Sequence, residues 1–308
     1  MPPGVGGASL AMRKRCIEDR CLMVYSEAII TATWSGKTML NSLPSKGFGL
    51  SLLHNLYHYR RYIWVNAWHE LWFQYAGTSL GVLWNLIHPL CEIIIYTVVF
   101  SLLLSRGSGD HFYALYLTSA LLPWRTFTDS LTAGGNAFKS NAHHLKRLPL
   151  PSEIFVTKAV VTASLLLVAY FVLLLPLTLI GGGQLGLSLF CLPLLAVLLQ
   201  TMALGMALGL ASLQILFPDI RQIVQFLLPL WSWTMPLFFP DTAVPEALRP
   251  WLDLNPPYAF LRSIRYIFLE NQIPELSLWG IMAGWSVVFL GLGITIHNCF
   301  KDEIRDLL

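Results

Sequence analysis

Four ionisable residues lie inside long apolar stretches of the sequence, where charged groups are costly. His88 and Glu92 are one helical turn apart in the first stretch, and Arg125 and Asp129 are one turn apart in the second. Ionisable side chains at such depth usually pair with one another or face a water-filled cavity. We expect Arg125 and Asp129 to form an ion pair. For His88 and Glu92, a pore lining and an internal hydrogen bond are both open.

Two short motifs resemble parts of nucleotide-binding sites. Residues 35–38 read SGKT, the end of a phosphate-binding loop, but position 31 is threonine where that loop needs glycine. Residues 181–184 read GGGQ, part of an ATPase signature, but they lie between two apolar stretches, where we expect a tight turn. No Ser/His/Asp, Cys/His or paired-carboxylate pattern stands out. We therefore expect no enzymatic activity in this chain, and neither a metal nor a cofactor of its own.

The composition points to a membrane. The chain has 308 residues, of which 55 % are hydrophobic and 12 % charged, and its mean hydropathy is +0.60. Soluble domains carry about 25 % charged residues. The deficit of charge extends over most of the chain, which indicates an integral membrane protein. The net charge of +3 is too small to argue for nucleic acid.

Six apolar stretches are each long enough to cross about 30 Å of hydrocarbon as a helix. The sequence therefore predicts an all-α, polytopic protein with six transmembrane helices. Basic residues concentrate in the N-terminal region, in 138–158, in 219–222 and at the C-terminus. The positive-inside rule places both termini in the cytoplasm. The six stretches are 82–104, 112–133, 160–180, 187–217, 223–239 and 279–300.

Residues 50–76 carry apolar side chains at helical spacing ahead of the first span. Trp64, Trp68 and Trp72 follow one another at four-residue steps, and Tyr75 comes next. Amphipathic rings of this kind settle in the headgroup layer, so we expect an amphipathic interfacial helix. The chain thus divides into a polar, poorly ordered extension (1–49), this interfacial helix (50–76) and a six-helix transmembrane domain (77–308).

Two of the apolar stretches have distinctive faces. Gly205 and Gly209, with Ala203, Ala207 and Ala211, form a small-residue face in the fourth stretch, which suits either packing within the subunit or a seam between subunits. The fifth stretch and its exit are rich in aromatic residues, which suits either an interfacial belt or a pore that contacts a glycan. Those aromatic residues are Trp231, Trp233, Phe238 and Phe239.

The segment 138–155 reads FKSNAHHLKRLPLPSEIF and is the basic loop between the second and third spans. It belongs to an ordered set of short motifs along residues 50–300. The motifs are Tyr75-x5-Gly81-x2-Trp84-x4-Pro89, Tyr96-Thr97-x2-Phe100, Leu122-Pro123-Trp124, Asn141-x3-Leu145-x3-Pro149-x-Pro151-x-Glu153-Ile154-Phe155, Pro218-Asp219-Ile220-Arg221, and Asn255-Pro256 with Arg262 and Arg265. This set resembles the membrane subunit of ABC-2 type polysaccharide exporters. The closest likeness is to exporters of lipid-linked O-antigen, with teichoic acid and capsule exporters as relatives.

This resemblance implies a homodimer in the bacterial inner membrane, bound to two copies of a separate ATPase that holds ATP and magnesium. Loop 138–155 would form a coupling helix seated in the ATPase, and Asp219 with Arg221 would make a second contact. The link 240–278 would fold as short re-entrant helices at the outer face. Within the loop, the coupling residues would be Asn141, Leu145, Lys146, Arg147, Pro149, Pro151 and Glu153.

The resemblance also implies a substrate, a polyprenyl-pyrophosphate-linked polysaccharide. The interfacial helix would help to admit its pyrophosphate end, and a path of aromatic residues would carry the glycan. Glu92, Trp231, Trp233, Phe238 and Phe239 are the candidates for that path. Two alternatives stay open: an ABC-2 exporter of capsule, teichoic acid, lipid or drug, and a membrane-embedded glycan transferase.

Overall fold

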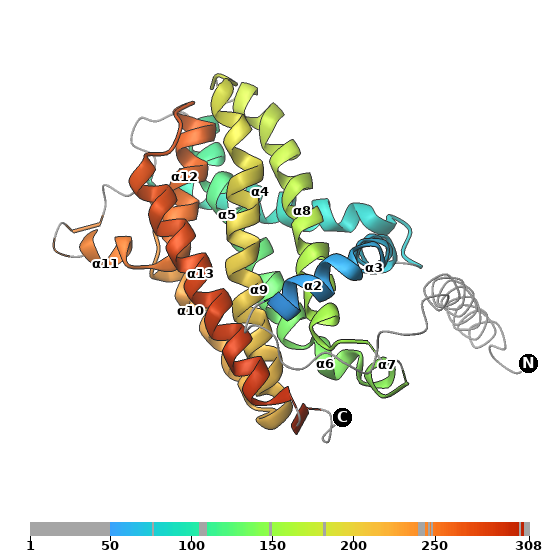
Figure 1. Cartoon of the computed structure of the whole chain (residues 1–308). Coiled ribbons are helices and arrows are strands. Elements are labelled where there is room, and N and C mark those ends of the chain that lie inside the picture. The colour runs from blue at the N-terminus through green and yellow to red at the C-terminus, as the bar shows by residue number, and fades with distance from the viewer. Residues whose placement is uncertain are drawn as a thin grey trace, which may run out of the picture. The chain divides into compact units, whose positions relative to one another are not determined.

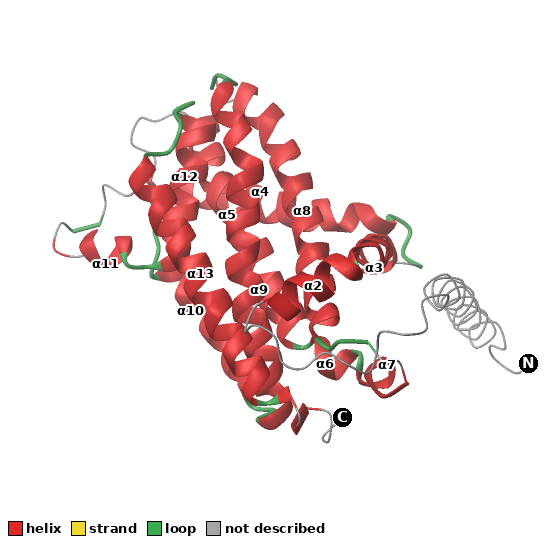
Figure 2. Ribbon diagram, viewed as in Figure 1, coloured by secondary structure: helices red, strands yellow, loops and turns green. Residues whose placement is uncertain are grey.

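The computed structural model describes residues 50–75, 77–104, 110–147, 150–180, 183–239, 244–245, 247, 249–301 and 303–304, and the expected extension 1–49 lies outside these ranges. Helices and loops make up this part of the chain, without a β-strand, which confirms the all-α class (Figure 2). The elements are α2 (Leu50–His58), α3 (Arg60–Phe73), η2 (Gly81–Leu83), α4 (Trp84–Leu104), α5 (Asp110–Gly135), α6 (Ala137–Ser140), α7 (Ala142–Arg147), α8 (Glu153–Ile180), η3 (Leu187–Cys191), α9 (Leu192–Leu216), α10 (Ile220–Trp233), α11 (Arg249–Asp253), α12 (Pro256–Leu269) and α13 (Leu276–Cys299).

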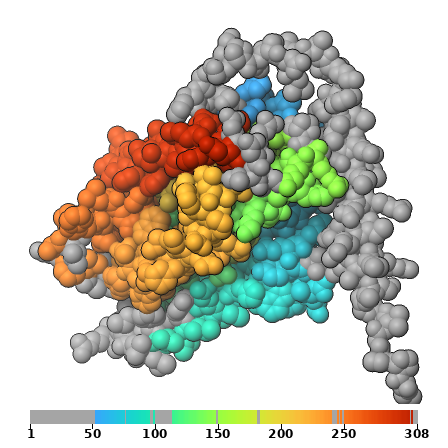
Figure 3. Space-filling model, turned by 90° about the horizontal axis from the view of Figure 1, so that it is seen from below, coloured from blue at the N-terminus to red at the C-terminus, as the bar shows by residue number. Residues whose placement is uncertain are grey.

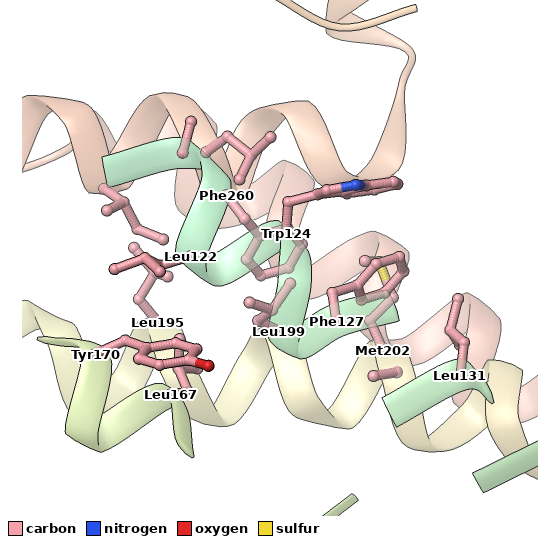
Figure 4. Close-up of a cluster of buried hydrophobic side chains, with 14 of the residues drawn as sticks. Leu122, Trp124, Phe127, Leu131, Leu167, Tyr170, Leu195, Leu199, Met202 and Phe260 are labelled. Carbon is pink, nitrogen blue, oxygen red and sulfur yellow. The ribbon is translucent and has the colours of Figure 1, made fainter. Parts of the chain in front are cut away.

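Helix α5 forms the centre of the bundle and contacts α4, α8, α9, α10 and α12 (Figure 1). Its buried side chains meet those of α8, α9 and α12 in a single apolar core (Figure 4). Lipid tails are as apolar as these side chains, so close packing rather than escape from solvent holds such helices together. The labelled core residues are Leu122, Trp124, Phe127, Leu131, Leu167, Tyr170, Leu195, Leu199, Met202 and Phe260.

The small-residue face of α9 packs against α13 of the same subunit. A Cβ atom on Gly205 would overlap the backbone of Leu290, and one on Gly293 would overlap the carbonyl group of Gly205. Gly209 also approaches Gly293. Missing side chains let the two backbones come this close. Of the two alternatives for this face, the structure therefore supports packing within the subunit.

Among the described residues, three helices are long and apolar enough to cross a membrane: α8, the continuous helix from Leu187 to Leu216, and α13. The expected spans 160–180, 187–217 and 279–300 fall on them. The other three expected spans fall on α4, α5 and α10. Together η2 and the first part of α4 form a shorter apolar helix, Gly81–Ile95. Helix α5 carries two charged residues in its second half, and α10 has only 14 residues.

The expected fifth span, 223–239, extends beyond the helix observed there, because α10 ends at Trp233. Pro236 has no N–H group to continue the helical hydrogen bonds. The carbonyl oxygens of Pro236 and Leu237 instead accept hydrogen bonds from buried Arg265 at 2.6 and 3.4 Å. The same guanidinium lies 3.8 Å from the centre of the Tyr116 ring. Arg265 thus holds in place the segment that follows α10.

The segment expected as one interfacial helix, 50–76, consists of two helices, α2 and α3, separated at Tyr59. One face of α3 is buried through Ile63, Ala67 and Leu71, and α3 lies against α8. Lys158 of α8 pairs with Glu70 at 3.4 Å. The tryptophan face points away from this contact and is exposed, as an interfacial helix requires. Its members are Trp64, Trp68 and Trp72.

Candidate functional site

The basic loop between α5 and α8 contains two short helices, α6 and α7, which meet at Asn141. The Asn141 side chain donates hydrogen bonds to the Ala137 carbonyl group at 2.8 Å and to Ser140 Oγ at 3.1 Å. The Ala137 carbonyl group, at the start of α6, also accepts from the backbone N–H of Asn141 at 3.1 Å, so Asn141 caps this short helix and fixes the turn into α7. Asn141 therefore shapes the loop from within.

The side chains of the loop divide into an inner and an outer set. Phe138 is buried, and Leu145 packs against the edge of the core. Lys146 and Arg147 are exposed. Pro149 lies outside the described residues, and Pro151 is partly buried. The loop therefore offers a basic outer surface that is anchored by apolar side chains on its inner side.

The lysine and arginine side chains of this surface receive little added charge from His144. Partial burial lowers the pKa of His144, and the nearby His143, Lys158 and Arg147 lower it further. A histidine with a lowered pKa is mostly neutral near pH 7. The exposed lysine and arginine side chains of the loop are Lys139, Lys146 and Arg147.

Glu153 is buried at the exit of the loop and faces the helices behind it. Its Oε1 atom accepts a hydrogen bond from Asn55 Nδ2 of α2 at 3.0 Å. Its Oε2 atom lies 3.4 Å from Ser152 Oγ and 3.8 Å from Nε2 of His297 in α13. A buried carboxylate needs such partners, since an unpaired charge is costly there. Glu153 thus connects the loop to α2 and α13 instead of presenting its carboxylate outward.

The ring of His297 joins two further groups to this network. Its Nε2 atom lies 3.3 Å from Ser152 Oγ, and its Nδ1 atom lies 3.1 Å from Ser212 Oγ of α9. The Ser212 hydroxyl donates to the Leu208 carbonyl group, so its oxygen is placed to accept from Nδ1–H of His297. The ring of Phe138 packs 5.7 Å from the imidazole. The loop is therefore linked to α2, α9 and α13 through one buried polar cluster, which we call the loop-base cluster: Asn55, Ser152, Glu153, Ser212 and His297.

The sequence prediction included Glu153 but missed His297, Ser212 and Asn55. A usable signal was present for His297, an ionisable residue near the end of an apolar span, by the same argument that selected His88 and Glu92. Nothing in the sequence separated Ser212 and Asn55 from other small polar residues.

The residues predicted for a second contact with an ATPase lie at the same end of the bundle as the basic loop. Asp219 lies in the turn that joins α9 to α10, and Arg221 lies in the first turn of α10, seven and nine residues after Ser212. Both side chains are exposed. In the view from this end, the loop (green), the α9–α10 turn (amber) and the end of α13 (red) lie beside one another (Figure 3). The described segments that were expected on one side of the membrane thus share one end of the molecule.

The residues predicted for a glycan path lie in different surroundings. Trp231 packs edge-on against Trp124 and Phe127, and its Nε1 group donates to Asn255 Oδ1 at 3.0 Å. Phe238 is buried beneath the ring of exposed Trp233, at 4.9 Å, whereas Phe239 is partly buried. The structure does not align these four aromatic residues along one surface.

The expected pairing of Arg125 with Asp129 is replaced by another. Arg125 Nη1 donates to Glu92 Oε2 of α4 at 2.5 Å. Glu92 lies on a neighbouring helix, whereas Asp129 lies one turn further along α5, so this ion pair joins two helices. Each of the two side chains is 35 % exposed, so neither is fully enclosed by the helices of this chain.

A polar cavity of about 610 Å³ lies next to this ion pair, between α3, α4, α5, α8 and α10. Its volume is within the range of about 300–1,000 Å³ found for small-molecule sites. Of the residues selected from the sequence, the cavity wall contains His88, Arg125, Asp129, Tyr75 and Arg221. Farther along α4, α5 and α8 lies a wholly apolar pocket of about 380 Å³, walled by Ile93, Thr118 and Leu177 among others.

Long apolar helices and an exposed tryptophan face are features of an integral membrane protein. Residues 61–269 match the profile of the ABC-2 type transporter family. This match covers more than half of the chain, so the chain belongs to that family.

Several relatives share most of their length with this chain. An O-antigen export system permease protein, RfbA, from Myxococcus xanthus is 28 % identical over 265 residues, covering 83 % of this chain and 99 % of the relative. The protein of the same name from Klebsiella pneumoniae is 22 % identical over 240 residues, covering 78 % of this chain and 92 % of the relative. The polysialic acid transport protein KpsM of Escherichia coli is 21 % identical over 237 residues, or 76 % and 92 %.

Proposed function

We propose that this chain is the membrane-spanning subunit of an ATP-driven exporter. Its substrate is a polyprenyl-pyrophosphate-linked, O-antigen-like polysaccharide, which it moves across the bacterial inner membrane. The observation that carries the proposal is the similarity to an O-antigen export permease over 99 % of that protein's length. The chain itself catalyses no bond chemistry in this proposal.

The proposed topology has six spans and cytoplasmic termini. Three helices have the required length and apolarity, and α4, α5 and α10 supply the other three. Prolines and charged residues in those helices are tolerated when neighbouring helices or a wet cavity satisfy them. The basic residues of loop 138–155 favour a cytoplasmic position for that end.

The proposed assembly is a homodimer with two copies of a separate ABC ATPase, which binds ATP and magnesium. The ATPase contacts the outer surface of the loop through Lys146 and Arg147, and the α9–α10 turn at Asp219 makes a second contact. When ATP draws the ATPase subunits together, the loop moves as a unit. The loop-base cluster passes this motion to α2, α9 and α13, as a rigid-body transition requires.

Deletion of the gene tests the proposal. A strain without this chain should keep lipid-linked polysaccharide on the cytoplasmic side of its inner membrane and show no polysaccharide on its surface. The wild-type chain should restore surface polysaccharide, and restoration should require the ATPase. Unchanged surface polysaccharide in the deletion strain would contradict the proposal.

The similarity to KpsM favours a second candidate, export of a capsule-type polysaccharide. The material that accumulates in the deletion strain separates the two candidates. A glycan on polyprenyl pyrophosphate supports the first, and a capsule-type glycan without that carrier supports the second.

A further inference from the structure

The exposed face of α3 combines aromatic rings with arginine. Trp64, Trp68 and Trp72 are between 46 % and 55 % exposed. Arg61 lies three residues before Trp64 and Arg60 lies four residues before it, so both belong to the same face of the helix. Both arginine side chains are exposed as well. We call this surface the Arg–Trp face, and its members are Arg60, Arg61, Trp64, Trp68 and Trp72.

The positive charge of the Arg–Trp face is not neutralised by nearby carboxylates. Helices α2 and α3 contain one carboxylate, Glu70, and Lys158 of α8 pairs with it at 3.4 Å. Within the described part of the chain, neither Arg60 nor Arg61 forms an ion pair. The two guanidinium groups can therefore pair with an anion from outside the chain.

Arg60 is held in an orientation that still allows it to bind an anion. Its Nη1 group donates to the Tyr57 carbonyl oxygen at 2.9 Å, and its guanidinium lies 4.2 Å from the centre of the Tyr57 ring. A guanidinium has five N–H donors, so one such bond leaves others for an external acceptor. Their forked geometry matches two oxygens of a phosphate group.

The packing of α3 fixes which way the Arg–Trp face points. The opposite side of the helix is buried through Ile63, Ala67 and Leu71, and α3 lies against α8 (Figure 1). Tryptophan rings at a membrane surface settle at the level of the lipid headgroups. Because Arg61 lies on the same face, its guanidinium reaches the layer of headgroup phosphates.

The charge of the headgroup decides which lipid fits this face best. In a zwitterionic lipid the phosphate is already balanced by the cationic group of the same headgroup. In an anionic lipid it is not, so that phosphate complements two arginines that lack a carboxylate partner. Basic residues beside an amphipathic aromatic face are typical of helices that bind anionic lipid surfaces.

We propose that the Arg–Trp face binds anionic phospholipid selectively, with Arg60 and Arg61 contacting the headgroup phosphates. Aromatic rings alone would place α3 at a membrane surface of any charge, whereas the arginines select the lipid. This binding is a property of the chain alone and is independent of what the chain exports.

Native mass spectrometry of the full-length chain in a neutral detergent tests the proposal. The probes are phosphatidylglycerol and phosphatidylcholine with identical acyl chains. We expect the wild type to bind phosphatidylglycerol more tightly. Arg61→Gln should lower this preference about fivefold, because each basic residue near an anionic surface adds to the attraction. Arg61→Lys keeps the charge and should retain most of the preference.

Two further variants make the result decisive. Arg60→Gln should also lower the preference, and it tests the proposal even if Arg61→Gln fails to fold. Lys139→Gln is the matched control, since it removes one positive charge from an exposed residue of α6, outside the Arg–Trp face. It should prefer phosphatidylglycerol as strongly as the wild type does.

Three results would overturn the inference: equal affinity of the wild type for the two lipids, an unchanged preference in both glutamine variants, or an equal loss of preference in Lys139→Gln. Co-purification with the ATPase tests a different occupant of the face. If Arg60→Gln and Arg61→Gln lose the ATPase but keep the lipid preference, the face binds a protein and the inference is wrong.

Discussion

The carboxylate of Glu153 lies 3.8 Å from Nε2 of His297, and both side chains are at most 5 % exposed. The two residues are far apart in sequence, one at the exit of the basic loop and the other near the end of α13. Their contact, with Ser212 and Asn55 around it, is the most direct connection between the loop and the helices behind it.

Glu153 and His297 should be energetically coupled. Glu153→Ala or His297→Ala alone leaves the other group buried without its partner, which should cost about 3–5 kcal/mol of unfolding free energy. The double variant should lose clearly less than the sum. Thermal unfolding in nanodiscs measures the stability of the two single variants and of the double variant. The control is Glu275→Ala, at an exposed position, which we expect to change stability by about 0.5 kcal/mol or less. Additive effects would show that the two groups do not interact.

The contact between α9 and α13 should depend on one glycine and not on its neighbour. A Cβ atom at Gly293 meets the Gly205 carbonyl group, whereas one at Gly291 meets open space. Gly293→Ala should therefore destabilise the protein by about 1–3 kcal/mol through overpacking. Gly291→Ala should raise its stability by up to about 1 kcal/mol, because alanine favours the helix. Equal melting temperatures for the two variants would argue against this packing.

The ion pair between Glu92 and Arg125 should contribute little to stability, because each side chain is 35 % exposed. We expect Glu92→Gln and Arg125→Gln each to lower the unfolding free energy by about 1 kcal/mol or less. A double-mutant cycle on melting temperature should show a small positive coupling. A loss of several kcal/mol in either single variant would mean that the pair is buried in the assembled transporter.

Helix α3 should lie at the membrane surface with its tryptophan face toward lipid headgroups. A nitroxide attached at Trp68→Cys, in a chain whose native cysteines are replaced by serine, should collide with both lipid-dissolved oxygen and a water-soluble nickel chelate. Collision with the chelate alone would place this face in water. On the opposite face, Ala67 is fully buried, so Ala67→Leu should cost about 1–3 kcal/mol by overpacking.

The sequence was sufficient to predict local features, but it was insufficient to predict which side chains pair across helices. The length of the apolar stretches placed a helix on each of the six expected spans, and the four-residue spacing of Trp64, Trp68 and Trp72 identified the exposed face of α3. Arg125 was paired with its neighbour along the helix, but the structure pairs it with Glu92, 33 residues away. Such a choice depends on how helices pack, which short-range patterns do not encode.

The same limit applies to the cavity and to the end of α10. The wall of the polar cavity draws on five helices, so no single stretch of sequence reveals it. Helix α10 was predicted too long because hydropathy continues through Phe239. Pro236 ends the helix earlier, because it has no N–H group. The buried guanidinium of Arg265 then bonds to the segment that follows, a contact visible only in three dimensions.

The measurement that tests the central claim most directly is export per ATP hydrolysed, in proteoliposomes containing this chain and its ATPase. Glu153→Gln keeps an acceptor for Asn55 but removes the charge that faces His297. We predict ATP hydrolysis close to that of the wild type and export per ATP lowered about tenfold, which corresponds to about 1.4 kcal/mol of lost coupling. Glu275→Gln should leave both unchanged. Undiminished export per ATP in Glu153→Gln would contradict the account, because the loop would then drive the helices without this contact.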